Sequence, residues 1–330
     1  MVSGIVNVYK EPGFTSFDVV AKCRGIFKQK KIGHAGTLDP IAEGVLVILL
    51  GSATKLSDYL TVQDKVYEAT ALLGRDTDTY DISGQTLAEA SATDLLSLTE
   101  EKIMDALNSF VGKQMQLPPI YSALKKDGKK LYEYAREGKE VEIAARPIEI
   151  YSIQLLTIDG LGSSDVRVRF LVHCSKGTYI RSLCHDLGQK LSVHACMEKL
   201  IRKETYGLSS DDGLTLGQLQ ELKDKGCLND AVEPLSTVLA SLPKVKVKDS
   251  GDKLLINGNK LQPGMVSFES QEAEEMFFAS LEKNREEDQD ARHLSPKDLA
   301  VFREGKIYAI YRYDEDGQVF KLNKMLRNEG

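Results

Sequence analysis

The sequence predicts a mixed α+β protein with a small β-rich domain at its C-terminal end. Predicted strands and helices are interspersed without the regular βαβ rhythm of a doubly wound parallel sheet. The 330 residues are enough for two domains, each able to bury its own core. Around residues 234–243 the pattern changes, and from Lys244 onward short strands alternate with glycine turns. This last part, about 85 residues, is expected to form a barrel or a sandwich.

Alternation, turn residues and a helix cap predict the first elements. Gly4–Lys10 alternates as a strand and runs into a Pro-Gly turn. Thr15 and Asp18 have the spacing of a capping box, so a helix should begin at this point. The basic stretch 28–36 is predicted to be a loop, and the apolar run 45–50 a buried strand.

The same signals place the elements that follow. Two prolines make residues 114–123 an extended loop. The segment 165–174 alternates with four apolar side chains on one face, and a tight turn at 175–177 then starts a helix. The predicted helices are 52–60, 99–110, 129–138 and 178–191, and the predicted strands are 65–74, 141–158 and 165–174.

Composition and charge limit the class of protein. The longest apolar run, 45–50, is far too short to span a membrane, and the N-terminus does not resemble a signal peptide. Five cysteines without an export signal indicate reduced thiols, so we expect a cytoplasmic protein without a membrane partner. The net charge is −6, but residues 113–147 and 165–205 are both net positive. Because phosphates respond to local charge, an RNA or DNA partner is compatible with this acidic chain.

Several cofactor and metal motifs fail on spacing. His173 and Cys174 are adjacent on a predicted strand and point to opposite faces, and no CxxC pair is present. The acidic stretch from Asp76 to Asp81 lacks the glycine and the final glutamate of a calcium loop, so we interpret it as a turn that braces a loop. Phosphate-binding glycine loops and the GxSxG motif are absent. We therefore predict neither a metal nor a cofactor.

One carboxylate stands in an unusual setting. Asp39 lies between Leu38 and Pro40 on a glycine-bracketed loop that follows the basic stretch. An aspartate before proline is usually a turn residue, so spacing alone leaves a catalytic role as the less common alternative. The role of the segment from Lys176 to Arg181 is also undecided from spacing alone, because it could simply be a helix start with a surface arginine.

Taken together, six segments of residues 10–188 resemble the TruB-type tRNA pseudouridine-55 synthases. They occur in the family's order with compatible spacing, and the departure is the Lys-Glu-Pro at 10–12, where the family has Lys-Pro. From about Lys244 the chain resembles the family's PUA domain. The segments are KEPGFTSFDVV (10–20), GHAGTLDPIAEGVL (33–46), DKVYEA (64–69), GRDTDTYDISG (74–84), QLPPIYSALKKDGKKLYEYAREG (116–138) and CSKGTYIRSLCHDLG (174–188).

The resemblance implies a fold and a domain division. The fold is the pseudouridine-synthase fold, a mixed and largely antiparallel central sheet flanked by helices and loops. Residues 1–240 would form the catalytic domain, with a T-arm-binding segment at about 113–147. Residues 244–330 would form a PUA-like RNA-binding domain, in which the acidic segment 269–290 has no counterpart that we can place.

The resemblance also implies a reaction. Uridine 55 in the T-loop of tRNA would be isomerised to pseudouridine on a flipped-out base. The implied catalytic residues are Asp39 as the carboxylate, Arg181 as its cation and Tyr67 as the ring that stacks on uracil and takes the C5 proton. The implied substrate-binding residues are His34, Lys10, Tyr179, Lys176 and Tyr121. We expect a monomer that needs neither a cofactor nor a guide RNA.

Some alternatives stay open at this stage. Asp39 could attack C1′ or abstract a proton to give a glycal, and His34 could be an exposed imidazole that caps the glycine loop. A non-catalytic RNA chaperone on the same fold and an N-glycosidase are the competing functions. A non-catalytic chaperone would be expected to lack Asp39, Tyr67 and Arg181, and all three are present. An N-glycosidase would usually have additional acidic residues to bind a metal or activate water, and the sequence lacks such clusters.

Overall fold

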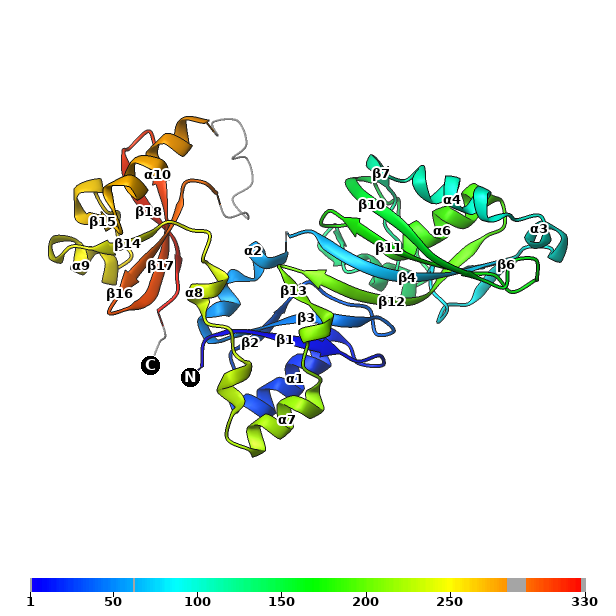
Figure 1. The fold of residues 1–330 in the computed structure, drawn as a ribbon, viewed down its shortest axis with the longest axis horizontal. Coiled ribbons are helices and arrows are strands. Elements are labelled where there is room, and N and C mark those ends of the chain that lie inside the picture. The colour runs from blue at the N-terminus through cyan, green and yellow to red at the C-terminus, as the bar shows by residue number, and fades with distance from the viewer. Residues whose placement is uncertain (1, 62, 284–294, 328–330) are drawn as a thin grey trace.

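The computed structural model describes residues 2–61, 63–283 and 295–327, and these form two sheets with their helices (Figure 1). The larger sheet contains every strand from β1 to β13 except two short hairpins, and the smaller sheet contains β14 to β18. In the described ranges, no helix is long and apolar enough to cross a membrane. The predicted mixed α+β class with a β-rich C-terminal part is confirmed.

The central sheet has the strand order β1-β3-β12-β4-β11-β10-β7, with β2 paired to β3 and β13 paired to β12. Within the described residues β12 and β3 run parallel, and the other pairs run antiparallel. This confirms a mixed, largely antiparallel sheet. The strands are β1 (Gly4–Lys10), β2 (Ile32–Ala35), β3 (Glu43–Leu50), β4 (Lys65–Leu73), β7 (Gly112–Gln116), β10 (Arg146–Asp159), β11 (Arg167–Cys174), β12 (Ala195–Thr205) and β13 (Leu208–Ser209).

Helices pack on both faces of this sheet. Helix α6 (Ile180–Leu191) packs on β12 and β4, and α4 (Glu100–Asn108) packs on β10, both behind the sheet in Figure 1. Helix α1 (Ser16–Phe27) begins at the predicted cap, where Thr15 and Asp18 form the reciprocal hydrogen bonds of a capping box. The other helices here are α2 (Ser57–Thr61, after a 3-10 turn at Gly51–Leu56), α3 (Ala92–Leu96), α5 (Leu131–Arg136), α7 (Leu216–Asp224) and α8 (Leu235–Val238).

Two predicted loops contain short strands. The stretch 28–36 includes β2, which pairs with β3 over four residues, so the prediction of a loop throughout is wrong. The stretch 114–123 begins inside β7 and becomes irregular only after Gln116, as its prolines require. Two hairpins stand apart from the large sheet, β5 (Arg75–Thr77) with β6 (Thr86–Glu89), and β8 (Lys125–Lys126) with β9 (Lys129–Lys130).

The C-terminal sheet has the order β15-β14-β16-β17-β18, and an isolated bridge joins Leu261, before β15, to Phe320 in β18. This bridge joins the edge strand β18 to the segment that leads into β15, the opposite edge strand, which favours the barrel over the sandwich. The acidic segment forms α10 (Gln271–Lys283), which buries Phe277 and Leu281, and residues 284–290 lie outside the described residues. The other elements are α9 (Asp249–Ile256), β14 (Lys244–Val247), β15 (Val266–Phe268), β16 (Asp298–Arg303), β17 (Lys306–Asp314) and β18 (Val319–Met325).

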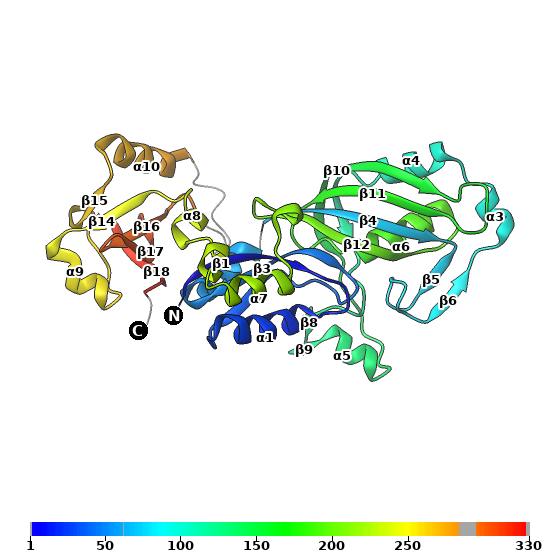
Figure 2. The same ribbon diagram turned by 60° about the horizontal axis from the view of Figure 1, so that its bottom comes forward.

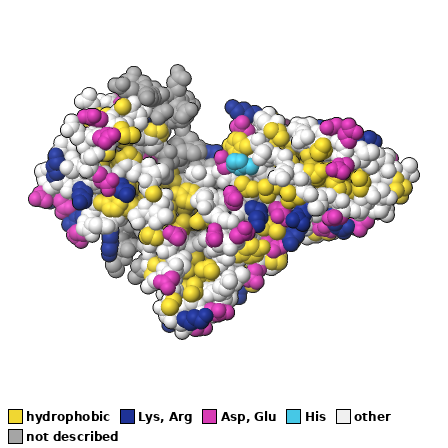
Figure 3. Space-filling view, viewed as in Figure 1, with side chains coloured by type: hydrophobic (Ala, Val, Ile, Leu, Met, Phe, Trp, Pro, Cys, Tyr) yellow, Lys and Arg dark blue, Asp and Glu magenta, His cyan; other side chains and the backbone are white. Residues whose placement is uncertain are grey.

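An apolar cluster joins the two parts of the chain. Leu56 and Tyr59, next to and within α2, belong to one buried cluster with Ala300, Ile310 and Leu326 of the C-terminal part. Figures 1 and 2 show the resulting shape, in which the C-terminal sheet packs beside α2 and α8 at one end of the central sheet. The space-filling view shows a notch between the two parts, with charged side chains of both signs on the wall formed by the central-sheet part (Figure 3).

Candidate active site

Asp39 lies on the loop between β2 and β3, and neighbouring elements hold this loop through hydrogen bonds. The hydroxyl of Ser16, at the start of α1, accepts from Leu38 N (2.9 Å) and donates to Leu38 O (3.2 Å). The ammonium of Lys10, which is fully buried at the end of β1, donates to the carbonyl of Ala42 (2.6 Å). Buried groups therefore hold the backbone on both sides of Asp39, and this positions its carboxylate before any substrate binds.

Arg181 is the charged partner of this carboxylate. It lies in the first turn of α6 with only 6% of its side chain exposed, and its Nε is 2.9 Å from Oδ2 of Asp39. Nη2 donates to Oδ1 at 3.2 Å, so the pair is bidentate. The remaining donors bind the carbonyls of Thr79 (3.1 Å) and Tyr121 (2.9 Å), and Nη1 is 3.8 Å from Oδ2 of Asp81. All three nitrogen atoms of the guanidinium therefore have hydrogen-bonding or ionic partners.

Burial and charge act in opposite directions on the ionisable groups. Burial raises the pKa of Asp39, and the positive charge of Arg181 opposes that rise. Burial lowers the pKa of Lys10 to about 8, although the negative charge of Asp39 favours its protonated form. At neutral pH, Lys10 therefore remains mostly protonated, and two cations, Arg181 and Lys10, favour the ionised form of Asp39.

Tyr67 lies on β4 and points to the face of the sheet that α6 covers. It is 8% exposed and pairs with Val172 and Arg202 on the neighbouring strands. Burial raises the pKa of its phenol, and Arg202 opposes this rise as a neighbouring charge and hydrogen-bonding group. The phenol is therefore neutral at neutral pH, with a cation positioned to stabilise its anion.

Arg202 is a site residue that the sequence patterns did not reveal. It is 1% exposed on β12, and its guanidinium donates to the carbonyls of Val45 (2.7 Å) and Gly36 (2.9 Å). At Gly44 (φ +95°) a Cβ atom would lie 2.3 Å from the carbonyl oxygen of Arg202, so glycine permits this close approach of β3 and β12. Arg202 thereby ties the Asp39 loop to the strand beside Tyr67.

Comparison with known proteins decides the family. The family model described as TruB family pseudouridylate synthase (N terminal domain) matches residues 24–180, and that of the tRNA pseudouridylate synthase B C-terminal domain matches residues 181–240. The tRNA pseudouridine synthase B of Clostridium perfringens (strain 13) is 40% identical over 329 residues, covering 99% of this chain and 100% of its own.

The chain belongs to the TruB family of pseudouridylate synthases.

Other relatives agree. The tRNA pseudouridine synthase B of Lactococcus lactis subsp. cremoris (strain MG1363) is 39% identical, over 98% of both chains. That of Staphylococcus aureus (strain Newman) is 44% identical over 79% of this chain and 85% of its own. Among solved structures, a chain of the Cbf5-Nop10-Gar1 complex superposes with a TM-score of 0.67 at 25% identity, over 98% of this chain and 85% of that one. The resemblance seen in the motifs and the pseudouridine-synthase fold are both confirmed.

In this TruB-family chain His34 lies on a strand and not in an exposed loop. It lies on β2, paired with Ile48 of β3, and is half-buried, so the alternative of an exposed imidazole that caps a loop is wrong. Its Nδ1 is enclosed without a hydrogen-bond partner among the described residues. Burial and the charge of Arg202 lower the pKa of His34, so the imidazole is neutral at neutral pH.

The remaining predicted residues, Tyr179, Tyr121 and Lys176, differ in how they are connected to the Asp39–Arg181 pair. Tyr179 precedes α6 and is half-buried, and the charges of Arg181 and Asp39 both act on its phenol, whose pKa is raised chiefly by burial. Tyr121 contributes its carbonyl to Arg181 and points its hydroxyl toward Asp78 (3.4 Å). Lys176 lies exposed on the turn between β11 and α6.

The acidic turn braces its own loop, as the sequence predicted. Asp78 accepts a hydrogen bond from the backbone of Gln85 (2.8 Å), and Asp81 accepts one from the backbone of Ser83 (3.0 Å). The other oxygen of Asp81 faces Arg181. The proximity of Asp81 to Arg181 was not predicted, because nothing in the local sequence shows which side chain a turn will meet.

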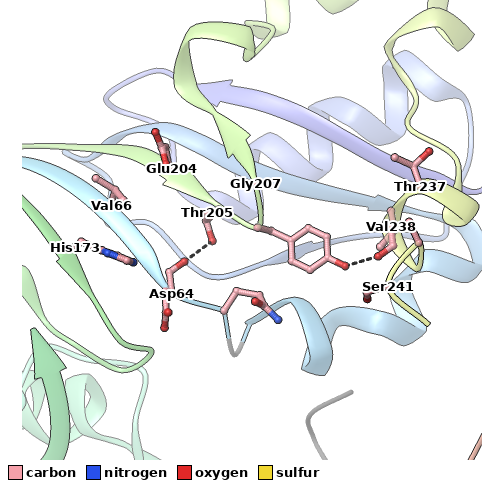
Figure 4. A pocket seen from close by; sticks show the side chains of 12 residues that line it. Asp64, Val66, His173, Glu204, Thr205, Gly207, Thr237, Val238 and Ser241 are labelled. Atoms are coloured by element: carbon pink, nitrogen blue, oxygen red, sulfur yellow. Dashed lines mark hydrogen bonds between the residues drawn. The ribbon is translucent and has the colours of Figure 1, made fainter. Parts of the chain in front are cut away.

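A groove of about 690 Å³ lies on the other face of the sheet, between β4, β11, β12 and residues 237–241 (Figure 4). It is lined by Val66, which points away from the side of Tyr67 because successive strand residues alternate. Asp64 and Glu204 also line it, and none of its described lining residues is lysine or arginine. An RNA backbone requires positive charge, so this groove is a poor substrate site.

Proposed function

We propose that this chain isomerises uridine 55 in the T-loop of tRNA to pseudouridine. The observation that supports the proposal most strongly is the bidentate Asp39–Arg181 pair on a braced loop, with Tyr67 buried nearby. The relatives' name, tRNA pseudouridine synthase B, supports tRNA as the substrate. The T-loop position rests on the resemblance of the motifs.

In the proposed reaction the C1′–N1 bond breaks and a C1′–C5 bond forms, while C5 loses a proton and N1 gains one. Substrate and product are isomers, so the atoms balance without an oxidant, a reductant or an activated donor. The carboxylate of Asp39 would act at the ribose, either attacking C1′ or abstracting a proton to give a glycal. Both routes need the ionised form, which Arg181 stabilises against the effect of burial.

Tyr67 would supply a stacking surface for the detached uracil, so that the base rotates without diffusing away. Stacking of this kind is worth about 1–3 kcal/mol per base. Because burial raises the pKa of the phenol, direct removal of the C5 proton by Tyr67 would depend on Arg202 to stabilise the phenolate as it forms. Arg202 would then be a positioning residue that acts through Tyr67.

The domain roles follow from the same proposal. Residues 1–240 would form the catalytic domain, 113–147 would hold the T-arm, and the PUA-like residues 244–330 would bind RNA outside the target loop. The uridine must leave its stack to reach Asp39, so recognition should depend on the shape and backbone of the folded T-arm. We propose that the chain acts as a monomer without a guide RNA, and that His34, Lys176, Tyr121 and Tyr179 contribute to the RNA-binding surface.

The test is tritium release from a [5-³H]uridine-labelled T-arm stem-loop by the wild type and by Asp39→Asn. We expect release by the wild type and none by Asp39→Asn, with RNA affinity of the variant within a few-fold because its shape is preserved. Turnover by the variant would remove Asp39 from the mechanism. Release of free uracil would indicate an N-glycosidase, and binding by the wild type without tritium release would indicate an RNA chaperone.

A further inference from the structure

The outer face of α1 carries an exposed aromatic ring and a run of cations that the proposed reaction does not use. Phe17 is 64% exposed, and it is the only mostly exposed phenylalanine among the described residues. The guanidinium of Arg24 lies 5.7 Å from the centroid of its ring. Residues 22–31 contain five lysine or arginine side chains and no aspartate or glutamate. An exposed aromatic ring beside cations is the combination that binds single-stranded nucleic acid.

These cations are available to a ligand. Arg24, Lys28 and Lys30 are exposed, and no ion pair within the described part of the chain involves them. Lys28 caps the C-terminal end of α1, about 16 Å along the helix from Phe17 at a rise of 1.5 Å per residue, whereas the guanidinium of Arg24 lies beside the ring. The surface therefore offers a ring at the start of the helix, with one cation beside it and others at the end of the helix.

This surface is attached directly to the candidate active site. Ser16, the residue before Phe17, forms the two hydrogen bonds that hold Leu38 next to Asp39. Figure 2 shows α1 on the same side of the molecule as β8, β9 and α5, which belong to the proposed T-arm segment. An RNA held by that segment with its target at Asp39 would pass close to α1.

We propose that the outer face of α1 binds the unpaired RNA strand next to the target uridine. One base stacks on Phe17, and Arg24 and Lys28 bind phosphates of the same strand. The strand is single because a duplex keeps its bases inside and offers none to an exposed ring. The partner is a nucleic acid and not a protein, because the apolar part of the surface is one side chain, far smaller than a protein interface requires. This inference rests on the proposed function and specifies how its substrate is held.

The stacking step is tested with Phe17→Leu, which keeps an apolar side chain but removes the aromatic face, and Phe17→Trp, which keeps that face. The dissociation constant for a fluorescent T-arm stem-loop is measured by anisotropy. We expect Phe17→Leu to bind roughly tenfold more weakly, as loss of one stacked base implies, and Phe17→Trp to bind within about threefold of the wild type. Equal affinity of Phe17→Leu and the wild type would overturn the proposal.

The phosphate contacts are tested by salt dependence. Arg24→Gln and Lys28→Gln should each reduce the slope of log K against log salt by about 0.7, the value for one phosphate contact on a single strand. Lys102→Gln, an exposed lysine on α4 in an acidic part of the chain, is the matched control and should leave the slope unchanged. Unchanged slopes for Arg24→Gln and Lys28→Gln would contradict the proposed contacts. If the wild type binds and converts the RNA while these variants bind normally, only the α1 surface is refuted. If the wild type does not bind the RNA, the proposed function fails as well.

Discussion

Replacing Arg181 with alanine should move the ionisation of Asp39 by a measurable amount. The guanidinium is bonded to both carboxylate oxygens, at 2.9 and 3.2 Å. Charges about 4 Å apart at an effective dielectric constant of about 20 attract each other by about 4 kcal/mol. Because 35% of the Asp39 side chain is exposed, water screens part of this attraction, which leaves about half of it, about 2 kcal/mol. Without Arg181 the ionised form of Asp39 loses this stabilisation, so the pKa of Asp39 should rise.

The direction of this pKa change determines how the reaction rate should depend on pH. Burial has already raised the pKa of Asp39, so losing Arg181 raises it further and the ionised fraction at a given pH falls. Single-turnover tritium release between about pH 5 and pH 9 should show the acid limb of the rate profile moved to higher pH, with partial recovery of the rate at high pH. Recovery stays partial because the carbonyls of Thr79 and Tyr121 also lose their donor.

Arg181→Lys is the control, because it keeps the charge but not the bidentate geometry. It should shift the acid limb less than Arg181→Ala, even if its maximal rate is low. A uniformly lower rate for Arg181→Ala with an unmoved acid limb would refute the electrostatic role and leave Arg181 as a structural support.

Three further predictions concern buried side chains. Tyr67→Phe should retain RNA affinity within about twofold and lose most turnover, since the ring still stacks but the hydroxyl is gone; unchanged single-turnover rates would remove the phenol from the mechanism. Arg202→Met should lower the free energy of unfolding in urea by about 3 kcal/mol, because the carbonyls of Val45 and Gly36 lose their donors; an unchanged unfolding midpoint would contradict this. For Lys10, the native pKa of about 8 lies below the ordinary 10.5, so the wild type should gain about 3 kcal/mol in stability relative to Lys10→Met as pH rises from 8 to 10.5; a constant difference would show that Lys10 titrates normally.

Local signals were sufficient for the elements near the N-terminus. The strand Gly4–Lys10 and the capped start of α1 were predicted correctly, because strand alternation and a capping box depend only on neighbouring residues. Strand β12 was missed, although it lies at the centre of the sheet. Its pairing with β4 shifts register twice, between Met197 and Lys199 and between Arg202 and Glu204. Each irregularity changes which face the next side chain takes, so the two-residue alternation that marks a strand is lost.

The sequence likewise identified some residues of the candidate site and missed others. Asp39, Tyr67 and Arg181 could be selected because each stands in a segment that resembles a family motif. The role of Arg202 and the contact of Asp81 with Arg181 could not be predicted from the sequence. An arginine in a strand with several charged residues is expected at the surface, and only the fold shows that Arg202 is buried. The burial of Lys10 could not be read from its strand either, because the carbonyls that accept its hydrogen bonds come from another loop.

The sequence alone therefore determined the mixed α+β class, the first strand and helix, the family resemblance and the carboxylate on which the chemistry is proposed to depend. Only the tertiary structure decided which cations face that carboxylate, in which direction burial shifts its pKa and which aromatic ring stays exposed on α1. Helix caps and strand alternation act over a few residues, whereas Asp39 and Arg181 are 142 residues apart in the chain and meet only when α6 packs beneath the sheet. Electrostatic interactions depend on distance in space and on exclusion of water, and the folded chain sets both.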